Sequence, residues 1–137
     1  MAVKQSTESF AELYCVELRT GRWQELVAWY KNALGMRSLL RVDDDRYALL
    51  AAGEARLAIV GREEPSRESG PSDRSVPHES SGRWTLAFEV ADLDVAIARL
   101  EGAGAEVLPT RLHPEGFVTV TTCDPDGNRV RLFRWPK

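Results

Sequence analysis

The pattern of apolar and polar positions changes period twice in the first third of the chain. Residues 13–18 (LYCVEL) alternate with a period of two, which predicts a β-strand. The next segment, TGRWQELVAWYKNALGM, repeats its apolar residues every three or four positions, which predicts an amphipathic helix. Thr20 is the expected N-cap of this helix, and Gly35 is the expected left-handed residue just beyond its end. The apolar stripe of the helix consists of Trp23, Leu26, Val27, Tyr30 and Leu34. Three short strand-like runs follow, at residues 38–42, 46–52 and 56–61.

The second half of the chain repeats this order. Residues 84–90 (WTLAFEV) alternate as a strand does, and Asp92 stands where a helix N-cap belongs, before LDVAIARLEGAG. Further strands are predicted at residues 106–112, 117–123 and 129–135. The chain therefore predicts one structural domain made of two strand–helix–strand–strand–strand modules, at residues 11–61 and 84–135.

Residues 62–83 separate the two modules and differ from both in composition. Residues 62–82 contain three prolines, six serines and eight charged residues, with Val76 as the only aliphatic side chain. Such a segment buries too little apolar surface to offset the entropy of ordering it. We expect a flexible linker, and a functional lid is the alternative, because connections of this length are uncommon in compact domains.

The composition of the 137 residues narrows the class of protein. With 43% hydrophobic and 28% charged residues, the chain can form one stable core. The net charge is −3 and the basic residues are scattered, which argues against nucleic acid and anionic membranes as partners. No apolar run is long enough to cross a membrane, and the first ten residues do not resemble a secretory leader. The two cysteines, Cys15 and Cys123, form no metal or redox motif, so we expect a reducing, cytoplasmic location.

Three segments carry a resemblance to a known family. They are VAWYKNALGM (27–36), LAFEVADLDVAIARLEGAGAEVL (86–108) and CDPDGNRVRLFRW (123–135). Together they resemble the vicinal oxygen chelate superfamily, which contains glyoxalase I, bleomycin-resistance proteins and extradiol dioxygenases. The resemblance implies an α+β fold in which two βαβββ modules pair curved mixed sheets around a cleft, with the helices outside. It also implies a homodimer, because related small proteins often complete or pair their clefts across two chains.

Strand alternation then assigns each side chain to the helix side or to the cleft side of its sheet. The helix side is apolar throughout, as a core requires. The cleft side mixes charged, small and aromatic residues, as in a partly hydrated binding site. The residues expected to line the cleft are Cys15, Glu17, Ala58, Thr85, Glu89, Arg129, Arg131 and Phe133.

Members of the family that are enzymes hold a divalent metal with His, Glu or Gln at four cleft positions. In this sequence the resemblance places those positions at Cys15, Ala58, Thr85 and Arg131. Alanine cannot ligate a metal, threonine rarely does, and the fixed charge of arginine repels a cation. We therefore predict no metal and no other cofactor.

Arg131 would replace the charge of that cation with its own. Its guanidinium could pair internally with Glu17 or Glu89, or it could bind the carboxylate or phosphate of a ligand in bidentate geometry. Trp84 and Trp135 could flank the mouth of the cleft and contact a planar ligand, although core or interface packing is an equally good explanation.

Three hypotheses for the function follow. The first is a metal-free protein that binds a small anionic or aromatic molecule in a charged cleft. The second is a metal-dependent lyase or dioxygenase with atypical ligands such as Cys15, Glu17 or Glu89. The third is a non-catalytic interaction module that uses residues 62–83 for recognition.

Overall fold

The computed structural model describes residues 10–62, 84–112 and 114–135. The first module begins with β1 (Val16–Thr20) and α2 (Trp23–Ala33). Three strands follow, β2 (Arg37–Val42), β3 (Tyr47–Ala52) and β4 (Ala55–Gly61). They form one sheet in the order β1-β4-β3-β2, in which β1 runs parallel to β4 and the other pairs are antiparallel.

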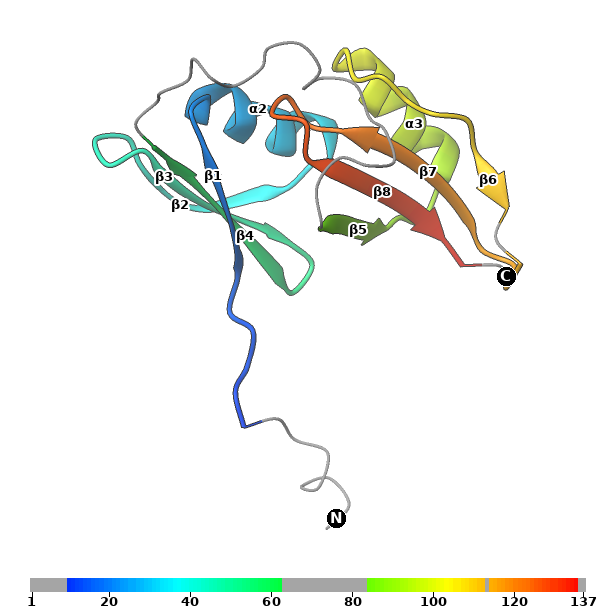
Figure 1. Ribbon diagram of the computed structural model, residues 1–137, viewed down its shortest axis with the longest axis horizontal. Coiled ribbons are helices and arrows are strands. Elements are labelled where there is room, and N and C mark those ends of the chain that lie inside the picture. The colour runs from blue at the N-terminus through cyan, green and yellow to red at the C-terminus, as the bar shows by residue number, and fades with distance from the viewer. Residues whose placement is uncertain (1–9, 63–83, 113, 136–137) are drawn as a thin grey trace.

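The second module has the same architecture. It consists of β5 (Thr85–Glu89), α3 (Leu93–Gly102), β6 (Arg111–Leu112), β7 (Val118–Cys123) and β8 (Arg129–Arg134). Its sheet has the order β5-β8-β7-β6, and here the first strand again pairs in parallel with the last. Figure 1 shows the first sheet with α2 on the left and the second sheet with α3 on the right. The predicted α+β fold of two βαβββ modules is confirmed.

The two modules share one hydrophobic core. Their helices and the helix-facing sides of both sheets contribute to a single cluster of buried residues. Tyr30 and Leu26 of α2 belong to it, and so do Leu100 of α3 and Val130 and Leu132 of β8. The apolar stripe read from the sequence thus faces the core. The indole nitrogen of Trp23 also donates a 3.0 Å hydrogen bond to the carbonyl of Ile59, which fixes α2 on β4.

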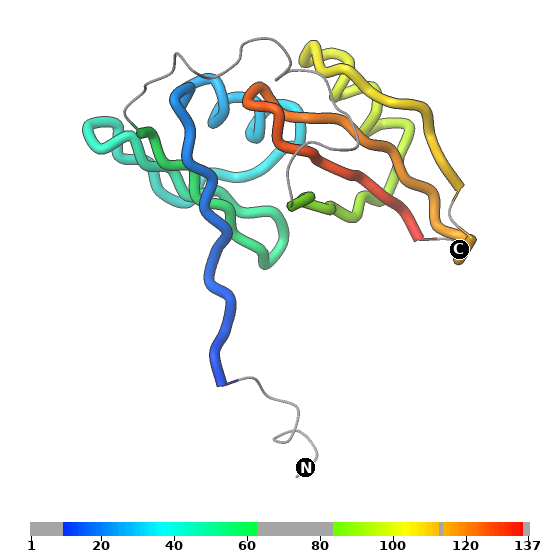
Figure 2. Tube along the Cα trace, in the orientation of Figure 1, coloured from blue at the N-terminus to red at the C-terminus, as the bar shows by residue number. Residues whose placement is uncertain are grey.

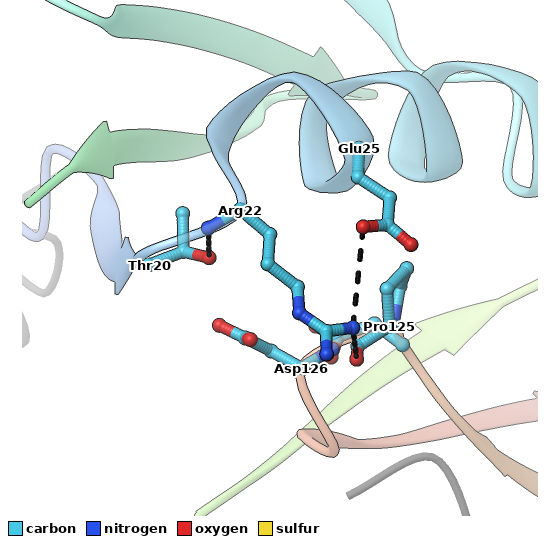
Figure 3. Close-up of polar contacts among 6 residues, drawn as sticks. Thr20, Arg22, Glu25, Pro125 and Asp126 are labelled. Carbon is cyan, nitrogen blue, oxygen red and sulfur yellow. Dashed lines mark hydrogen bonds and ion pairs between the residues drawn. The ribbon is translucent and has the colours of Figure 1, made fainter. Parts of the chain in front are cut away.

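Polar contacts connect α2 to the β7–β8 turn of the second module. The hydroxyl of Tyr30 donates a 2.6 Å hydrogen bond to Oδ2 of Asp124. Nearby, Nη1 of Arg22 donates a 3.0 Å hydrogen bond to the carbonyl of Pro125 and lies 3.9 Å from Oε1 of Glu25 (Figure 3). The modules are therefore held together by hydrogen bonds as well as by apolar packing.

Several element boundaries differ from those read in the sequence. The first strand begins at Val16 and not at residue 13, and the preceding residues run away from the sheet, with Leu13 82% exposed (Figure 2). The N-cap of α2 is Arg22 and not Thr20, but the Thr20 hydroxyl still accepts a 2.8 Å hydrogen bond from the Arg22 amide. The predicted cap at Asp92 is confirmed, since its carboxylate accepts a hydrogen bond from the Val95 amide.

Of the strand predicted at residues 106–112, only Arg111 and Leu112 pair as a strand. Pro109 has no amide hydrogen to donate, so a continuous ladder cannot pass through it. The linker prediction falls on residues that are almost all outside the described part of the chain. No helix in the described part is long and apolar enough to span a membrane.

Candidate functional site

A cavity of about 710 Å³ lies on the face of the second sheet that points away from α3. We call this cavity the arginine pocket. Its charged and hydroxyl-bearing lining comes from β6, β7, β8 and the segment before β6. The lining residues are Leu108, Pro109, Thr110, Arg111, Leu112, Pro114, Thr119, Thr121, Arg129 and Arg131. It therefore has a hydroxyl- and guanidinium-bearing floor and an apolar rim.

The position of the floor follows from strand register. Arg129 and Arg131 alternate with the buried Val130 and Leu132 along β8, so both guanidinium groups leave the sheet on the face opposite the core. Arg131 is paired with Thr121 of β7, and side chains that are directly opposite in a sheet lie side by side on one face. The same two strands thus form core on one side and pocket on the other.

The pocket is electrostatically one-sided. Arg111, Arg129 and Arg131 each carry a positively charged guanidinium group, and no acidic residue is among the described residues that line the pocket. Arg131 is exposed, and within the described part of the chain it makes no hydrogen bond or ion pair. Three guanidinium groups around one cavity create a positive potential that favours an anion.

Thr119 supplies a buried polar group in the same pocket. The residue is only 8% exposed, and its hydroxyl has no hydrogen-bond partner among the described residues. Buried hydroxyl groups are nearly always hydrogen-bonded, because leaving one without a partner costs about 1–3 kcal/mol. A ligand oxygen in the pocket would satisfy it.

The structure separates the residues that the sequence predicted to share one cleft. Arg129 and Arg131 line the arginine pocket. Thr85 is the register partner of Arg129, and Glu89 is the register partner of Phe133, so these residues lie on the same face of the second sheet. The remaining three belong to the first module: Glu17 is the register partner of the fully buried Ala58, and Cys15 precedes β1. None of these three lines the arginine pocket.

The internal ion pair considered for Arg131 is absent. Neither Glu17 nor Glu89 takes part in an ion pair with the described residues, in contrast to Glu25, which lies near Arg22, and Asp43, which pairs with Arg41. The guanidinium of Arg131 is therefore directed to the pocket without a carboxylate partner from the described chain. This leaves the ligand-binding alternative for Arg131 as the one that the geometry favours.

The four positions at which the family would place metal ligands do not offer a suitable donor set. Ala58 has no donor atom and is 0% exposed, and Arg131 is cationic. Cys15 precedes β1 of the first sheet, whereas Thr85 begins β5 of the second. In the described part of the chain, no group of three or more His, Cys, Asp or Glu residues is arranged to hold a metal ion. His78 and His113 lie outside the described residues.

Of the residues that line the pocket, the sequence analysis assigned only Arg129 and Arg131 to a binding site. Arg111, Thr119 and Thr121 were read only as parts of strands. The alternation of FVTVTTC carried the signal for the two threonines, because Thr119 and Thr121 oppose Val118 and Val120. Arg111 could not be found in this way, because its place in the pocket depends on how the irregular segment before β6 folds over the sheet.

A second cavity, of about 620 Å³, lies between α2, the end of α3 and the β7–β8 turn. It is lined by Asp124, whose carboxylate is 1% exposed and accepts hydrogen bonds from Tyr30, from the Asp126 amide and from both the amide and the side chain of Asn128. Burial raises the pKa of Asp124, and these hydrogen bonds partly oppose that rise. The carboxylate of Asp124 is therefore fully engaged within the fold and has a structural role.

The neighbouring Cys123 is also unsuited to chemistry. It is 5% exposed, and burial, followed by the charges of Asp124 and Glu106, raises the pKa of its thiol to about 11. A thiol with such a pKa is almost entirely protonated near neutral pH and is a poor nucleophile. Cys123 is therefore a structural residue of the fold.

Comparison with known proteins identifies the family. The uncharacterized protein YraH of Bacillus subtilis (strain 168) is 24% identical over 125 residues, which cover 90% of this chain and 98% of that protein. Among solved structures, a glyoxalase family protein from Enterococcus faecalis is 27% identical with a TM-score of 0.65, covering 90% of this chain and 98% of that one. Lactoylglutathione lyase from Agrobacterium tumefaciens has a TM-score of 0.66 at 22% identity, covering 90% and 93%.

The family model described as Glyoxalase/Bleomycin resistance protein/Dioxygenase superfamily matches residues 13–132. This range contains every residue that lines the arginine pocket. The chain belongs to the Glyoxalase/Bleomycin resistance protein/Dioxygenase superfamily.

Proposed function

We propose that this protein binds a small anionic molecule in the arginine pocket, without a metal ion. The observation that carries the proposal is the set of three guanidinium groups around one cavity with no acidic residue among its described lining. A carboxylate or phosphate would accept bidentate hydrogen bonds from Arg131 and a hydrogen bond from the Thr119 hydroxyl. Binding of this kind serves sequestration or sensing of the ligand.

The charge of the pocket also favours the metal-free form of the hypothesis. A divalent cation bound beside Arg131 would be repelled by a guanidinium that cannot lose its proton. An anion, in contrast, is attracted to the guanidinium groups of the pocket. The metal-dependent lyase or dioxygenase considered from the sequence has no comparable support in the described residues.

Calorimetric titration tests the proposal directly. Wild-type protein is titrated with inorganic phosphate, succinate and 2-naphthoate, which together sample phosphate, aliphatic and aromatic anions. For any of these anions that binds, we expect Arg131→Gln to lower the affinity by about ten- to a hundredfold, because a charge-assisted hydrogen bond contributes about 1.5–3 kcal/mol.

Arg134→Gln is the matched control for this experiment. It removes the same charge from the same strand, but Arg134 lines a separate cavity of about 340 Å³ together with Asp92 and Asp94. We expect its effect on affinity to be less than about twofold, as for a surface charge screened by salt. Equal losses in the two variants would mean that net charge and not the pocket determines binding, and would contradict the proposal.

The homodimer and the cytoplasmic location are parts of the same proposal. Family analogy supports the dimer, and the two free thiols, Cys15 and Cys123, fit a reducing compartment. Light scattering after size-exclusion chromatography measures the mass in solution, and a mass of one chain at micromolar concentration would contradict the dimer.

A further inference from the structure

Three aromatic side chains form a cluster beside the arginine pocket. The rings of Phe117 and Phe133 lie 5.9 Å apart between centroids, those of Phe117 and Trp135 5.1 Å, and those of Phe133 and Trp135 5.5 Å. All three pairs meet edge to face, which is a favourable geometry for aromatic rings. We call these three residues the aromatic cluster.

The cluster and the pocket lie on the same face of the second sheet. Arg129, Arg131, Phe133 and Trp135 follow each other at every second position along β8 and its end, so their side chains point to one side. Phe133 is also the register partner of Thr119, whose buried hydroxyl lines the pocket. The aromatic cluster therefore follows the two arginines along β8, and it also lies beside a pocket residue on the neighbouring strand β7.

The cluster is also accessible from that face. Phe117 and Phe133 are only partly buried, and Trp135 is 50% exposed. These rings do not belong to the shared hydrophobic core, which lies on the opposite face of the sheet. Apolar surface next to a positively charged cavity is the combination that recognises a molecule with one anionic end and one apolar, planar end.

The carboxylate of Glu89 favours one orientation of an anionic ligand on this face. It is the register partner of Phe133 on the side away from Thr119, so a carboxylate stands beside the aromatic end of the face. An anionic group is repelled from that end and attracted to the arginines. A ligand with a single charge would therefore bind with its anionic group toward Arg131 and its ring toward Phe133.

We infer that the ligand of this protein is a planar aromatic carboxylate, held by the arginine pocket at its charged end and by the aromatic cluster at its ring. This inference rests on the proposed function, since it uses the same pocket. It adds the chemical class of the ligand, which the arginines alone do not specify.

The test compares three probes that differ in one property each. 2-Naphthoate has both the ring and the charge, decahydro-2-naphthoate keeps the charge on a saturated frame, and 2-naphthalenemethanol keeps the ring without the charge. We expect 2-naphthoate to bind most tightly of the three probes. Phe133→Leu should lower the affinity for 2-naphthoate by about two- to tenfold, as expected for the loss of one aromatic contact. Arg131→Gln should lower the affinity for both carboxylates.

Two controls keep the result interpretable. Trp84→Leu removes an aromatic side chain of the same module that is 86% exposed and lies outside the cluster, so it should leave all affinities unchanged. Circular dichroism and sedimentation of each variant show whether the fold and the association state are retained.

The outcomes separate the two proposals. If both carboxylates bind equally well, lose affinity in Arg131→Gln and are unaffected by Phe133→Leu, the aromatic class is wrong and the anion-binding function stands. If neither these carboxylates nor inorganic phosphate binds, or if Arg131→Gln has no effect on binding, both proposals are wrong; if phosphate alone binds, only the aromatic class is wrong. If Phe133→Leu changes the association state without changing affinity, the aromatic cluster is an interface between chains, and the inference is overturned.

Discussion

Replacing Tyr30 by phenylalanine tests the polar contact between the modules. The mutation removes one oxygen atom, which donates a 2.6 Å hydrogen bond to Asp124. Tyr30 and Asp124 are 0% and 1% exposed, so water cannot replace the lost donor. Hydrogen bonds to charged groups contribute about 1.5–3 kcal/mol, so we expect the free energy of unfolding to fall by this amount at pH 7. For a chain of this size the melting temperature should fall by roughly 5–12 °C.

The effect of the mutation should depend on pH. Burial raises the pKa of Asp124 above its ordinary value of 3.8, and the Tyr30 hydrogen bond partly opposes this rise. Between the unfolded and folded pKa values the native state binds more protons than the unfolded state, so stability falls as pH rises through this window. Loss of the Tyr30 hydroxyl raises the pKa of Asp124 in the folded state further, so stability falls more steeply as pH rises. The cost of Tyr30→Phe should therefore be largest at neutral pH and shrink as pH falls through the raised folded pKa of Asp124.

Urea denaturation at several pH values measures both quantities. Tyr47→Phe is the matched control, because it removes the same atom from a partly exposed tyrosine whose hydroxyl makes no hydrogen bond with the described residues. We expect this control to change stability by less than about 0.5 kcal/mol. A cost for Tyr30→Phe that equals the control, or that is the same at pH 4 and pH 7, would refute the reasoning.

Three further predictions concern a turn, the thiols and metal ions. Gly35 has φ of +71°, and a Cβ built there would lie 3.4 Å from Nη2 of Arg99, so Gly35→Ala should cost about 1–2 kcal/mol in urea denaturation. Gly102→Ala is the control, because Gly102 is helical and a Cβ built there meets no neighbouring side chain within 4 Å, so this variant should be neutral or more stable. Equal losses of stability in the two variants would mean that the left-handed conformation of Gly35 is not the cause of the loss. Iodoacetamide at pH 8, followed by mass spectrometry, should label the partly exposed Cys15 well before Cys123, whose thiol has a pKa raised to about 11; faster labelling of Cys123 would contradict its burial. Added Zn²⁺, Ni²⁺, Mn²⁺ or Fe²⁺ should leave the melting temperature within about 1 °C, whereas a true site at a hundredfold excess over its Kd would add about 2.7 kcal/mol and show a clear rise.

The fold was largely predictable because its signals are local. The helix stripe that includes Trp23 and Tyr30, the Asp92 cap and the left-handed Gly35 each follow from a few neighbouring residues, and the structure contains all of them. The boundaries that differ depend on longer-range pairing. β1 begins only where it can pair with Leu57 of β4, and the segment around Pro109 leaves the ladder although its neighbour Leu108 still donates a hydrogen bond to Thr121.

The candidate site was predictable only in part, for a related reason. Alternation along β8 assigned Arg129 and Arg131 to the correct face, since a period of two needs no tertiary information. The roles of Asp124 and Arg111 depend on contacts with distant segments. Asp124 lies in the segment CDPDGNRVRLFRW that carries the family resemblance, yet its carboxylate is bound by Tyr30 of α2, 94 positions away in the sequence. No local pattern reports such a contact.

The shared core determines how this chain can be divided. The polypeptide passes from one module to the other only once, between Gly61 and Thr85, whereas the packing between the modules involves both helices and the Asp124 turn. A cut in that connection would leave two fragments, each exposing its half of the common apolar surface, and the second carrying a carboxylate that needs the hydroxyl of Tyr30. Neither half would be stable alone, but together they contain every contact of the intact core. The two modules are thus suited to fragment complementation, in which folding of each piece depends on meeting the other.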